Sequence, residues 1–442
     1  MSIQLSDHFT YKKLLRFTLP SIAMMIFTSI YGVVDGFFVS NFVGKTPFAA
    51  VNFIMPFLMI LGAFGFMFGT GGSALISKTM GEGDLPKANR LFSMLVCISV
   101  SLGIVIAVFG IIFLRPAASL LGAEGELLDY CVLYGRIILA AIPAFMLQQE
   151  FQSFFITAER PQLGLYTTVI AGVANMILDE LFIAVFKWGV AGAAIATAIS
   201  QCIGGVIPIL YFLRPNTSLL KLTKPSFDGK ALLKTCTNGS SELMSNVSMS
   251  LVGMLYNIQL MKYAGENGVA AYGVLMYVCL IFIAAFIGYT IGTAPVIGYH
   301  YGAGNHDELK SLFKKSLVII GVFSVGMLLL GEVLAKPLSV LFVGYDTDLL
   351  QLTLRGFAIF SFSFLFSGIA IYGSGFFTAL NNGLISAVIS FLRTLVFQVV
   401  AIIILPIVWG IDGIWVSIVA AEVMAAAVTI LFWIANRNKY HY

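Results

Sequence analysis

The stretch NMILDELFIAVFKWGVAGAAIAT, from Asn175 to Thr197, predicts two apolar helices joined by a short turn around Trp188. Asn175 and Asp179 stand four residues apart, so they share one face of the first helix. Asp179 lies nine residues before Trp188, and Thr197 lies nine residues after it. At 1.5 Å per residue both side chains lie roughly 13 Å from the turn, which is close to the middle of a bilayer if the turn lies at its surface.

A further acidic residue, Asp35, fits the same depth because it precedes Gly44, in the next polar turn, by nine residues. A carboxylate at this depth costs about 2.5 to 3.5 kcal/mol even on insertion scales, and it usually lines a cavity or a pathway. The predicted site therefore contains four oxygen-bearing side chains, Asp35, Asn175, Asp179 and Thr197. These oxygens suit Na⁺, by analogy with other hard cations, or a proton held between two close carboxyl groups. The alternative is a buried structural hydrogen-bonded pair.

The composition places the chain in a lipid bilayer. It is 59% hydrophobic and 10% charged, with a mean hydropathy of +0.96, whereas soluble domains are about one quarter charged. The polar N-terminus lacks the pattern of a cleavable signal peptide, so we expect the first helix to be retained. In a membrane protein the net charge of +4 reflects which loops face the cytoplasm, so no nucleic-acid partner is expected. Five scattered cysteines argue against a disulfide framework or a zinc site.

Twelve apolar runs are long enough to cross a bilayer. They lie at about residues 15–40, 48–77, 91–114, 128–156, 163–186, 190–213, 231–263, 269–298, 316–335, 349–379, 384–408 and 412–435. With the N-terminus in the cytoplasm, the inner segments hold seventeen lysines and arginines and the outer turns hold five. This bias follows the positive-inside rule, so both termini are predicted to be cytoplasmic. The fold class is therefore an all-α polytopic membrane protein with twelve transmembrane helices.

An offset of 221 residues, half of the chain, relates four clusters without a gap. One example is Trp188-Gly189, which recurs as Trp409-Gly410. The chain is thus predicted to consist of two six-helix lobes, residues 1–213 and 231–442, joined by a basic cytoplasmic linker at 214–230. An even number of helices in each lobe makes the repeats parallel, related by a pseudo-two-fold axis along the membrane normal, and this favours rocking of one lobe against the other.

Other residues have weaker signals. Pro20 lies fifteen residues before Asp35 and favours a kink, which we interpret either as a hinge or as a fixed bend. Glu150 is predicted to make a structural or gating hydrogen bond, and Glu242 is predicted to cap the start of the seventh helix. A minority of the aromatic and methionine side chains could line a cavity for aromatic cations. In the second lobe these candidates are Tyr256, Met276, Tyr277, Phe282 and Tyr372.

Several catalytic chemistries are not supported. No Walker pattern or metalloprotease pattern is present. The sequence Gly81-Glu82-Gly83-Asp84 looks like part of an intramembrane protease motif, but it recurs as Gly302-Ala303-Gly304-Asn305 without the acid, so we interpret it as turn chemistry. We expect a transporter without enzymatic activity or a cofactor. An intramembrane enzyme would need a paired nucleophile and base at depth, and the sequence shows no such pair. A receptor or scaffold that transports nothing would not need two matched lobes with acids at mid-membrane, so the sequence favours a transporter over this class as well.

Together these residues resemble the multidrug and toxic compound extrusion (MATE) transporters along the whole chain. The shared features are Pro20 with Asp35, the Asn175-x-x-x-Asp179 pair with Thr197, and the Gly-x-Gly-[Asp/Asn] loops. The segment 34–39 and the entry to the seventh helix look closest to the bacterial MepA-like branch. The resemblance implies an antiporter in a bacterial inner membrane that expels amphipathic organic cations and xenobiotics by alternating access. It also implies that Asp35, Asn175, Asp179 and Thr197 hold the coupling ion, Na⁺ or H⁺.

The chain departs from part of that family, because the tenth predicted helix has no acid of the kind some members use in the second lobe. We therefore favour coupling through the first lobe. The rival function is a flippase for a lipid or lipid-linked saccharide, which would want a cationic cavity. The only basic residues within the spans are Arg136, Arg355 and Arg393. We expect a monomer, since nothing in the repeat requires a partner.

Overall fold

The structure is a computed structural model, and it describes residues 3–442 apart from the side chains at positions 40 and 45. The described part of the chain contains helices and no strand. In chain order the elements are α1 Tyr11–Phe42, α2 Lys45–Gly62, α3 Phe64–Gly81, α4 Leu85–Leu120, α5 Gly125–Thr157, α6 Pro161–Asp179, the π-helix η1 Glu180–Val185, α7 Gly189–Leu213, α8 Gly229–Gly302, α9 His306–Val343, α10 Thr347–Phe360, the 3₁₀-helix η2 Ser361–Ser363, α11 Phe364–Ala379, α12 Gly383–Phe391, the π-helix η3 Leu392–Val396 and α13 Phe397–Tyr440.

Within the described residues, ten helical stretches are long and apolar enough to cross a membrane. Two of them, Gly229–Gly302 and Gly383–Tyr440, are far longer than one bilayer requires. Each is interrupted by a glycine outside the helical region, Gly265 at φ 60° and Gly410 at φ 57°. Glycine adopts this backbone without the steric cost that a Cβ would bring. Each stretch therefore contains two spans, and the predicted total of twelve is confirmed.

The internal repeat is also visible in the backbone. Three pairs of glycines that the offset relates have positive φ at both members: Gly44 with Gly265, Gly83 with Gly304, and Gly189 with Gly410. The loops after Gly83 and Gly304 end in matching helix caps. Asp84 Oδ1 accepts from Lys87 N–H at 3.0 Å, and Asn305 Oδ1 accepts from Glu308 N–H at 3.2 Å. The interpretation of these loops as turn chemistry is confirmed, because each side chain satisfies one of the free N–H groups of a helix start.

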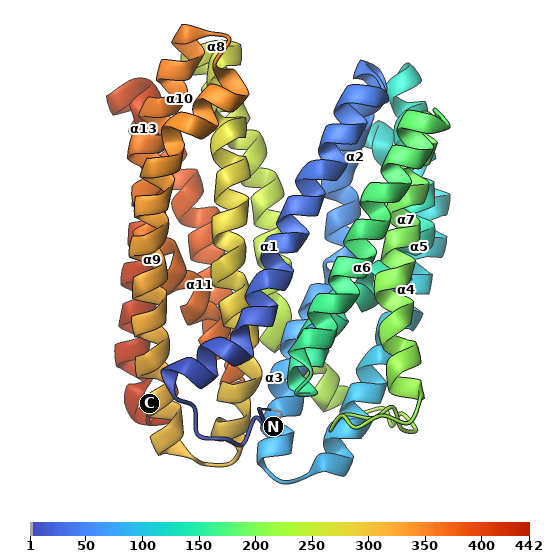
Figure 1. Cartoon of the computed structure of the whole chain (residues 1–442), viewed down its shortest axis with the longest axis vertical. Coiled ribbons are helices and arrows are strands. Elements are labelled where there is room, and N and C mark those ends of the chain that lie inside the picture. Colours follow the sequence, from blue (N-terminus) through green and yellow to red (C-terminus); the bar gives the residue numbers. More distant parts are fainter. Residues whose placement is uncertain (1–2) are drawn as a thin grey trace.

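The two lobes share a hydrophobic core at one end only. We call this the closed end; it carries both termini, and the opposite end, where the lobes diverge, is the open end (Figure 1). One buried cluster at the closed end takes residues from both lobes, for example Phe155 and Phe376. The buried residues of two further clusters each come from a single lobe, one around Ile138 and one around Trp415, and the start of α8 also packs against the first of these. The molecule is thus packed together at the closed end and divided at the open end.

Close backbone contacts between the lobes obey the pseudo-two-fold repeat. A Cβ on Gly81 would lie 2.0 Å from the carbonyl oxygen of Tyr299, and a Cβ on Gly302 would lie 2.1 Å from that of Lys78. The 221-residue offset converts the first contact into the second. Neither position has room for a side chain, so α3 and α8 meet backbone to backbone at the closed end.

Candidate cation site

Three helices of the first lobe bring the four predicted oxygen ligands together. Asp35 lies on α1, Asn175 and Asp179 lie on α6, and Thr197 lies on α7. The Asp35 and Asp179 carboxyl groups face each other closely enough to interact directly. Their approach is helped by Gly172, where a Cβ would lie 2.6 Å from the Phe27 ring, so α1 packs tightly on α6. Helices α1, α6 and α7 thus gather the side chains that the depth argument selected.

The site is buried and its polar atoms are not satisfied. Asp179 is fully buried and Asn175 is 2% exposed. Within the described part of the chain, no hydrogen-bond partner exists for Asp35 Oδ1, either Asp179 oxygen, Asn175 Nδ2 or Thr197 Oγ1. A buried polar group left without a partner costs about 1 to 3 kcal/mol, and more if it is charged. Carboxylate, amide and hydroxyl oxygens suit a hard cation or a shared proton.

A π-helix begins directly after Asp179. Residues 180–185 form η1, which widens the last turns of this span before the turn at Trp188. Single π-helical turns are rare and often occur at functional sites. Ser200 on α7 donates to the Ala171 carbonyl at 2.8 Å and ties α7 to α6 near the site. The polar face of α6 is therefore held in place from both sides.

Tyr134 on α5 is a site residue that the sequence analysis missed. It is 1% exposed, and its hydroxyl lies beside Asp35, Asp179 and Thr197. The hydroxyl donates to Met55 Sδ at 3.8 Å, which is a weak bond. Tyr134 follows the turn residue Gly125 by nine residues, so the depth rule that selected Asp35 would also have selected this tyrosine.

Pro20 lies inside α1, well before Asp35. The α1 helix bends in its lower part, between the closed end and the middle of the molecule (Figure 1). The second lobe approaches here, because a Cβ on Gly288 would lie 2.6 Å from Ile22 Cα and 2.7 Å from the Ser21 carbonyl oxygen. The proline therefore sits where α1 passes from the shared core to the part that carries Asp35.

The five predicted cavity residues of the second lobe do not share one cavity wall. Tyr256, Phe282 and Met276 belong to or border the core of that lobe, and Tyr256 donates to Gln398 Oε1 at 2.7 Å. Tyr372 is fully buried in the core of the closed end. Tyr277 is exposed, with its ring stacked on Phe342 at 6.2 Å. The structure therefore brings Tyr256, Met276 and Phe282 together in the core of the second lobe and places Tyr277 and Tyr372 elsewhere.

The second lobe instead has a buried ion pair. Arg393 Nε donates to Glu422 Oε2 and Arg393 Nη2 to Glu422 Oε1, each at 2.9 Å, with the side chains 15% and 6% exposed. Glu242 lies near the same guanidinium. It is well inside α8, which starts at Gly229 with Asp228 as its cap, so the prediction that Glu242 caps this helix is wrong.

The flippase alternative requires a cationic cavity, and the basic residues within the spans do not form one. Arg393 is neutralised by Glu422, and Arg355 pairs with Asp412. Arg136 is exposed on α5, away from Tyr134 and the interior of the first lobe. None of the three basic residues within the spans offers a free interior charge for a phosphate headgroup.

Glu150 is a second buried acid of the first lobe. It is fully buried on α5, next to Ser99 of α4. Within the described residues neither of its carboxylate oxygens has a hydrogen-bond partner, so the predicted structural hydrogen bond is not found. Glu150 lies sixteen residues beyond Tyr134 along α5, closer to the closed end, and it does not join the Asp35 group.

Comparison with known proteins covers both lobes. The family model described as MatE matches residues 20–181 and 243–404. The multidrug export protein MepA of Staphylococcus haemolyticus is 27% identical over 434 residues, which are 97% of this chain and 94% of that protein. MepA of Staphylococcus aureus strain MSSA476 is 24% identical over 432 residues, with the same coverage.

Solved structures match the fold. An outward-facing conformation of a multidrug resistance MATE family transporter superposes with a TM-score of 0.93 at 22% identity, over 100% of this chain and 98% of that one. A MATE structure in a bent conformation superposes with a TM-score of 0.88 at 23% identity, over 99% and 97% of the two chains. At this level of identity the likeness concerns the arrangement of the helices.

Proposed function

The chain belongs to the MatE family of multidrug export transporters, and we propose that it exports amphipathic organic cations in exchange for Na⁺ or H⁺. The observation that carries the proposal is the pair of neighbouring carboxyl groups on Asp35 and Asp179, inside a membrane lobe. Among the described residues, Asp35 Oδ1 and both Asp179 oxygens have no hydrogen-bond partner. Two like charges at close range in a low-dielectric interior repel strongly. One monovalent cation or one proton between them removes that repulsion.

Exchange requires that the ion binds the two states of the transporter differently. Asp35 is carried by α1, which also packs against the second lobe near Pro20, whereas Asp179 is carried by α6. A cation that joins the two carboxyl groups therefore favours one position of α1 relative to α6. By linkage, an ion that favours one packing of the first lobe weakens the binding of a substrate that favours the other. The inward ion gradient then drives the substrate outward.

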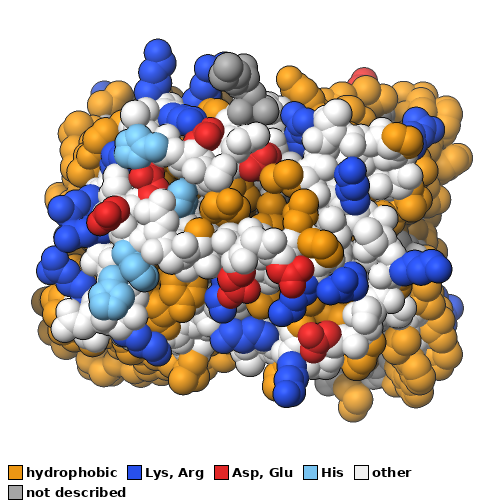
Figure 2. Space-filling model, turned by 90° about the horizontal axis from the view of Figure 1, so that it is seen from below, with side chains coloured by type: hydrophobic (Ala, Val, Ile, Leu, Met, Phe, Trp, Pro, Cys, Tyr) orange, Lys and Arg blue, Asp and Glu red, His pale blue; other side chains and the backbone are white. Residues whose placement is uncertain are grey.

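The charge distribution supports the direction of transport. Lysine and arginine side chains are spread over the face of the closed end, which also carries the histidines (Figure 2). Under the positive-inside rule this face lies in the cytoplasm. The diverging lobes then open to the outside, which is the state that takes up the coupling ion and releases the substrate.

The test is transport of tetraphenylphosphonium by proteoliposomes under a Na⁺ gradient and, separately, under a pH gradient. Wild type is compared with Asp35→Asn, Asp179→Asn and the exposed control Asp307→Asn. We expect gradient-driven transport in the wild type and the control and none in the two site variants, and the gradient that works names the ion. If both site variants still pump, the carboxyl pair is structural and coupling lies elsewhere.

A further inference from the structure

The first described residues, 3–10, run along the closed end before α1 begins (Figure 1); we call this segment the strap. A turn within it is held by Asp7, whose Oδ2 accepts from Gln4 N–H at 2.9 Å and pairs with Lys13 at 2.8 Å. Burial alone would raise the pKa of Asp7, but these two partners outweigh it and lower the pKa. The strap is therefore an ordered part of the closed end.

The strap is anchored to the first lobe through Glu159. Leu5 N–H donates to Glu159 Oε1 at 2.6 Å. Glu159 lies in the turn between α5 and α6 at φ 61°, a conformation that is uncommon for residues other than glycine and costs free energy. That turn aims a carboxylate at the backbone of a segment 154 residues away in the sequence.

A second anchor belongs to the other lobe. Glu308, in the first turn of α9, accepts from Phe9 N–H at 2.9 Å through Oε1 and bonds His8 Nδ1 at 2.6 Å through Oε2. Lys315, two turns further along α9, donates to the Phe9 carbonyl. Both hydrogen-bonding groups of the Phe9 backbone are thus held by side chains of the second lobe, and charged partners make these bonds stronger than neutral ones.

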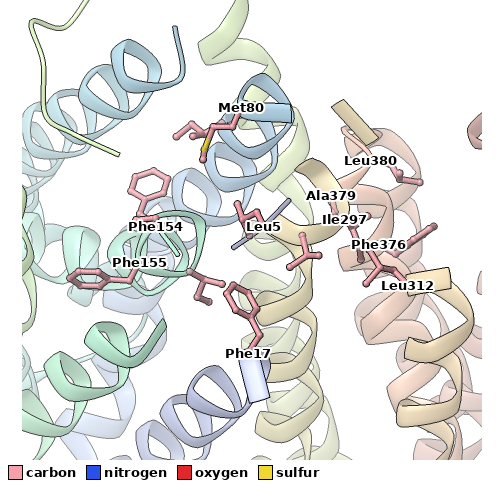
Figure 3. Close-up of a cluster of buried hydrophobic side chains, with 14 of the residues drawn as sticks. Leu5, Phe17, Met80, Phe154, Phe155, Ile297, Leu312, Phe376, Ala379 and Leu380 are labelled. Carbon is pink, nitrogen blue, oxygen red and sulfur yellow. The ribbon is translucent and has the colours of Figure 1, made fainter. Parts of the chain in front are cut away.

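The apolar side chains of the strap fill the junction between the lobes. Leu5 and Phe9 are both fully buried. Leu5 lies between Met80 and Phe155 of the first lobe on one side and Ile297 of the second lobe on the other (Figure 3). A segment that only covered the surface would not leave these side chains without exposed area.

Geometry limits what the strap can do when the lobes move. Its anchor points, Leu5 and Phe9, are four residues apart, so they can be separated by at most about 14 Å even in a fully extended chain. The strap is turned rather than extended, so it can follow a small separation by straightening, but only up to that limit. When the closed end opens, as alternating access requires, Glu159 and Glu308 move apart, and beyond that reach the strap has to leave one of them. We propose that the strap is a latch that holds the closed end shut and is released when the transporter turns inward.

The latch rests on the proposed alternating access, so its test measures conformation and not transport. Spin labels go on Lys87→Cys and Lys310→Cys, exposed positions on the two lobes at the closed end, in a background without the five native cysteines. The distance between the labels in liposomes is compared for Glu159→Ala, Glu308→Ala and the neighbouring control Asp307→Ala. We expect the two anchor variants to raise the long-distance population by roughly tenfold, since each loses a hydrogen bond to a charged group.

A second measurement leaves the anchors intact. A single Leu5→Cys in the cysteine-free protein should react slowly with a membrane-impermeant maleimide added at the closed end. It should react faster when Gly302→Val forces the lobes apart. Rapid labelling without Gly302→Val would show that the strap is not seated, and would overturn the latch.

The outcomes separate the two proposals. If Gly302→Val lengthens the label distance but neither anchor variant differs from Asp307→Ala, the lobes move and the latch is wrong. If neither the variants nor added substrate change the distance between the two labels, the lobes do not alternate. That outcome would contradict both the proposed function and the latch.

Discussion

At the scale of single residues, charge placement inside the membrane separates the two lobes. In the first lobe Asp35 and Asp179 face each other, and no basic side chain that the structure describes pairs with either of them. The second lobe pairs Glu422 with Arg393, and Glu242 lies near the same guanidinium. An uncompensated pair of carboxyl groups has to be neutralised by something from outside the chain, whereas an internal ion pair does not. This difference is the physical reason to assign ion coupling to the first lobe.

Tyr134→Phe tests how far the cation site extends beyond the predicted ligands. Loss of one hydroxyl removes about 0.5 to 1.5 kcal/mol of interaction, so the ion concentration for half-maximal transport should rise by roughly two- to tenfold. Tyr130→Phe, one turn earlier on α5, is the control and should leave that concentration unchanged. Equal ion dependence in the two variants would remove Tyr134 from the site.

The Arg393 pair makes a prediction about stability. Arg393→Met leaves Glu422 buried without its partner, which should cost about 3 to 5 kcal/mol of unfolding free energy. The double variant Arg393→Met with Glu422→Met should recover most of that loss, because an apolar pair of similar volume removes the uncompensated charge. Thermal unfolding of the purified proteins in one detergent measures both. Similar midpoints for the single and double variants would contradict a coupled ion pair.

The residue scale also shows what the sequence could and could not predict. A count of nine residues from a turn placed Asp35, Asp179 and Thr197 at one depth, because straight helices convert sequence distance into height. The partner of Arg393 was not predictable, since Glu422 lies 29 residues away on another span. Which residues face one another across a lobe depends on helix rotation, and the π-helix η3 around Arg393 changes that rotation locally.

At the scale of elements, α1 connects the shared core of the closed end to the candidate cation site. It is a single helix, Tyr11–Phe42, with Pro20 inside it. The proline deprives the helix of one backbone hydrogen bond and bends it where the second lobe makes contact. The sequence predicted a kink at this point. It did not predict π-helical turns at 180–185 and 392–396, which have no simple signal in residue type.

Pro20→Ala should stiffen α1 by restoring that hydrogen bond. If the bend is a hinge, the maximal transport rate falls severalfold while the ion concentration for half-maximal transport stays the same, because the site itself is untouched. Pro116→Ala in α4 is the control for a proline inside a helix away from the lobe interface. A normal rate in Pro20→Ala would assign the proline to shape alone.

At the scale of the whole molecule, the repeat builds an interface that can close tightly at one end. Gly81 and Gly302 occupy equivalent places and each meets a carbonyl of the other lobe. The number of spans and the repeat were predictable from the sequence, because the length of each apolar run and the matching residues at the 221-residue offset can be seen without knowing how the helices pack. The open end was not, since a closed or open arrangement of the same lobes has the same helices and the same local sequence.

Gly81→Val and Gly302→Val should have equal effects because the pseudo-two-fold axis exchanges them. Each side chain would collide with a backbone carbonyl, hold the closed end apart and abolish transport, while the distance between labels at residues 87 and 310 increases. Gly321→Val, where no atom lies within 4 Å of the added Cβ, is the control. Opposite or unequal shifts for the two variants would show that the closed end is not symmetric in function.

The most direct test of first-lobe coupling is ion binding to the purified protein, by ²²Na⁺ binding and by proton uptake, with and without tetraphenylphosphonium. The wild type should bind one coupling ion, and the organic cation should weaken that binding, as linkage requires. Asp179→Asn should lose the ion and still bind the organic cation. If Asp179→Asn binds both Na⁺ and protons as the wild type does, the ion is held elsewhere and coupling through the carboxyl pair is contradicted.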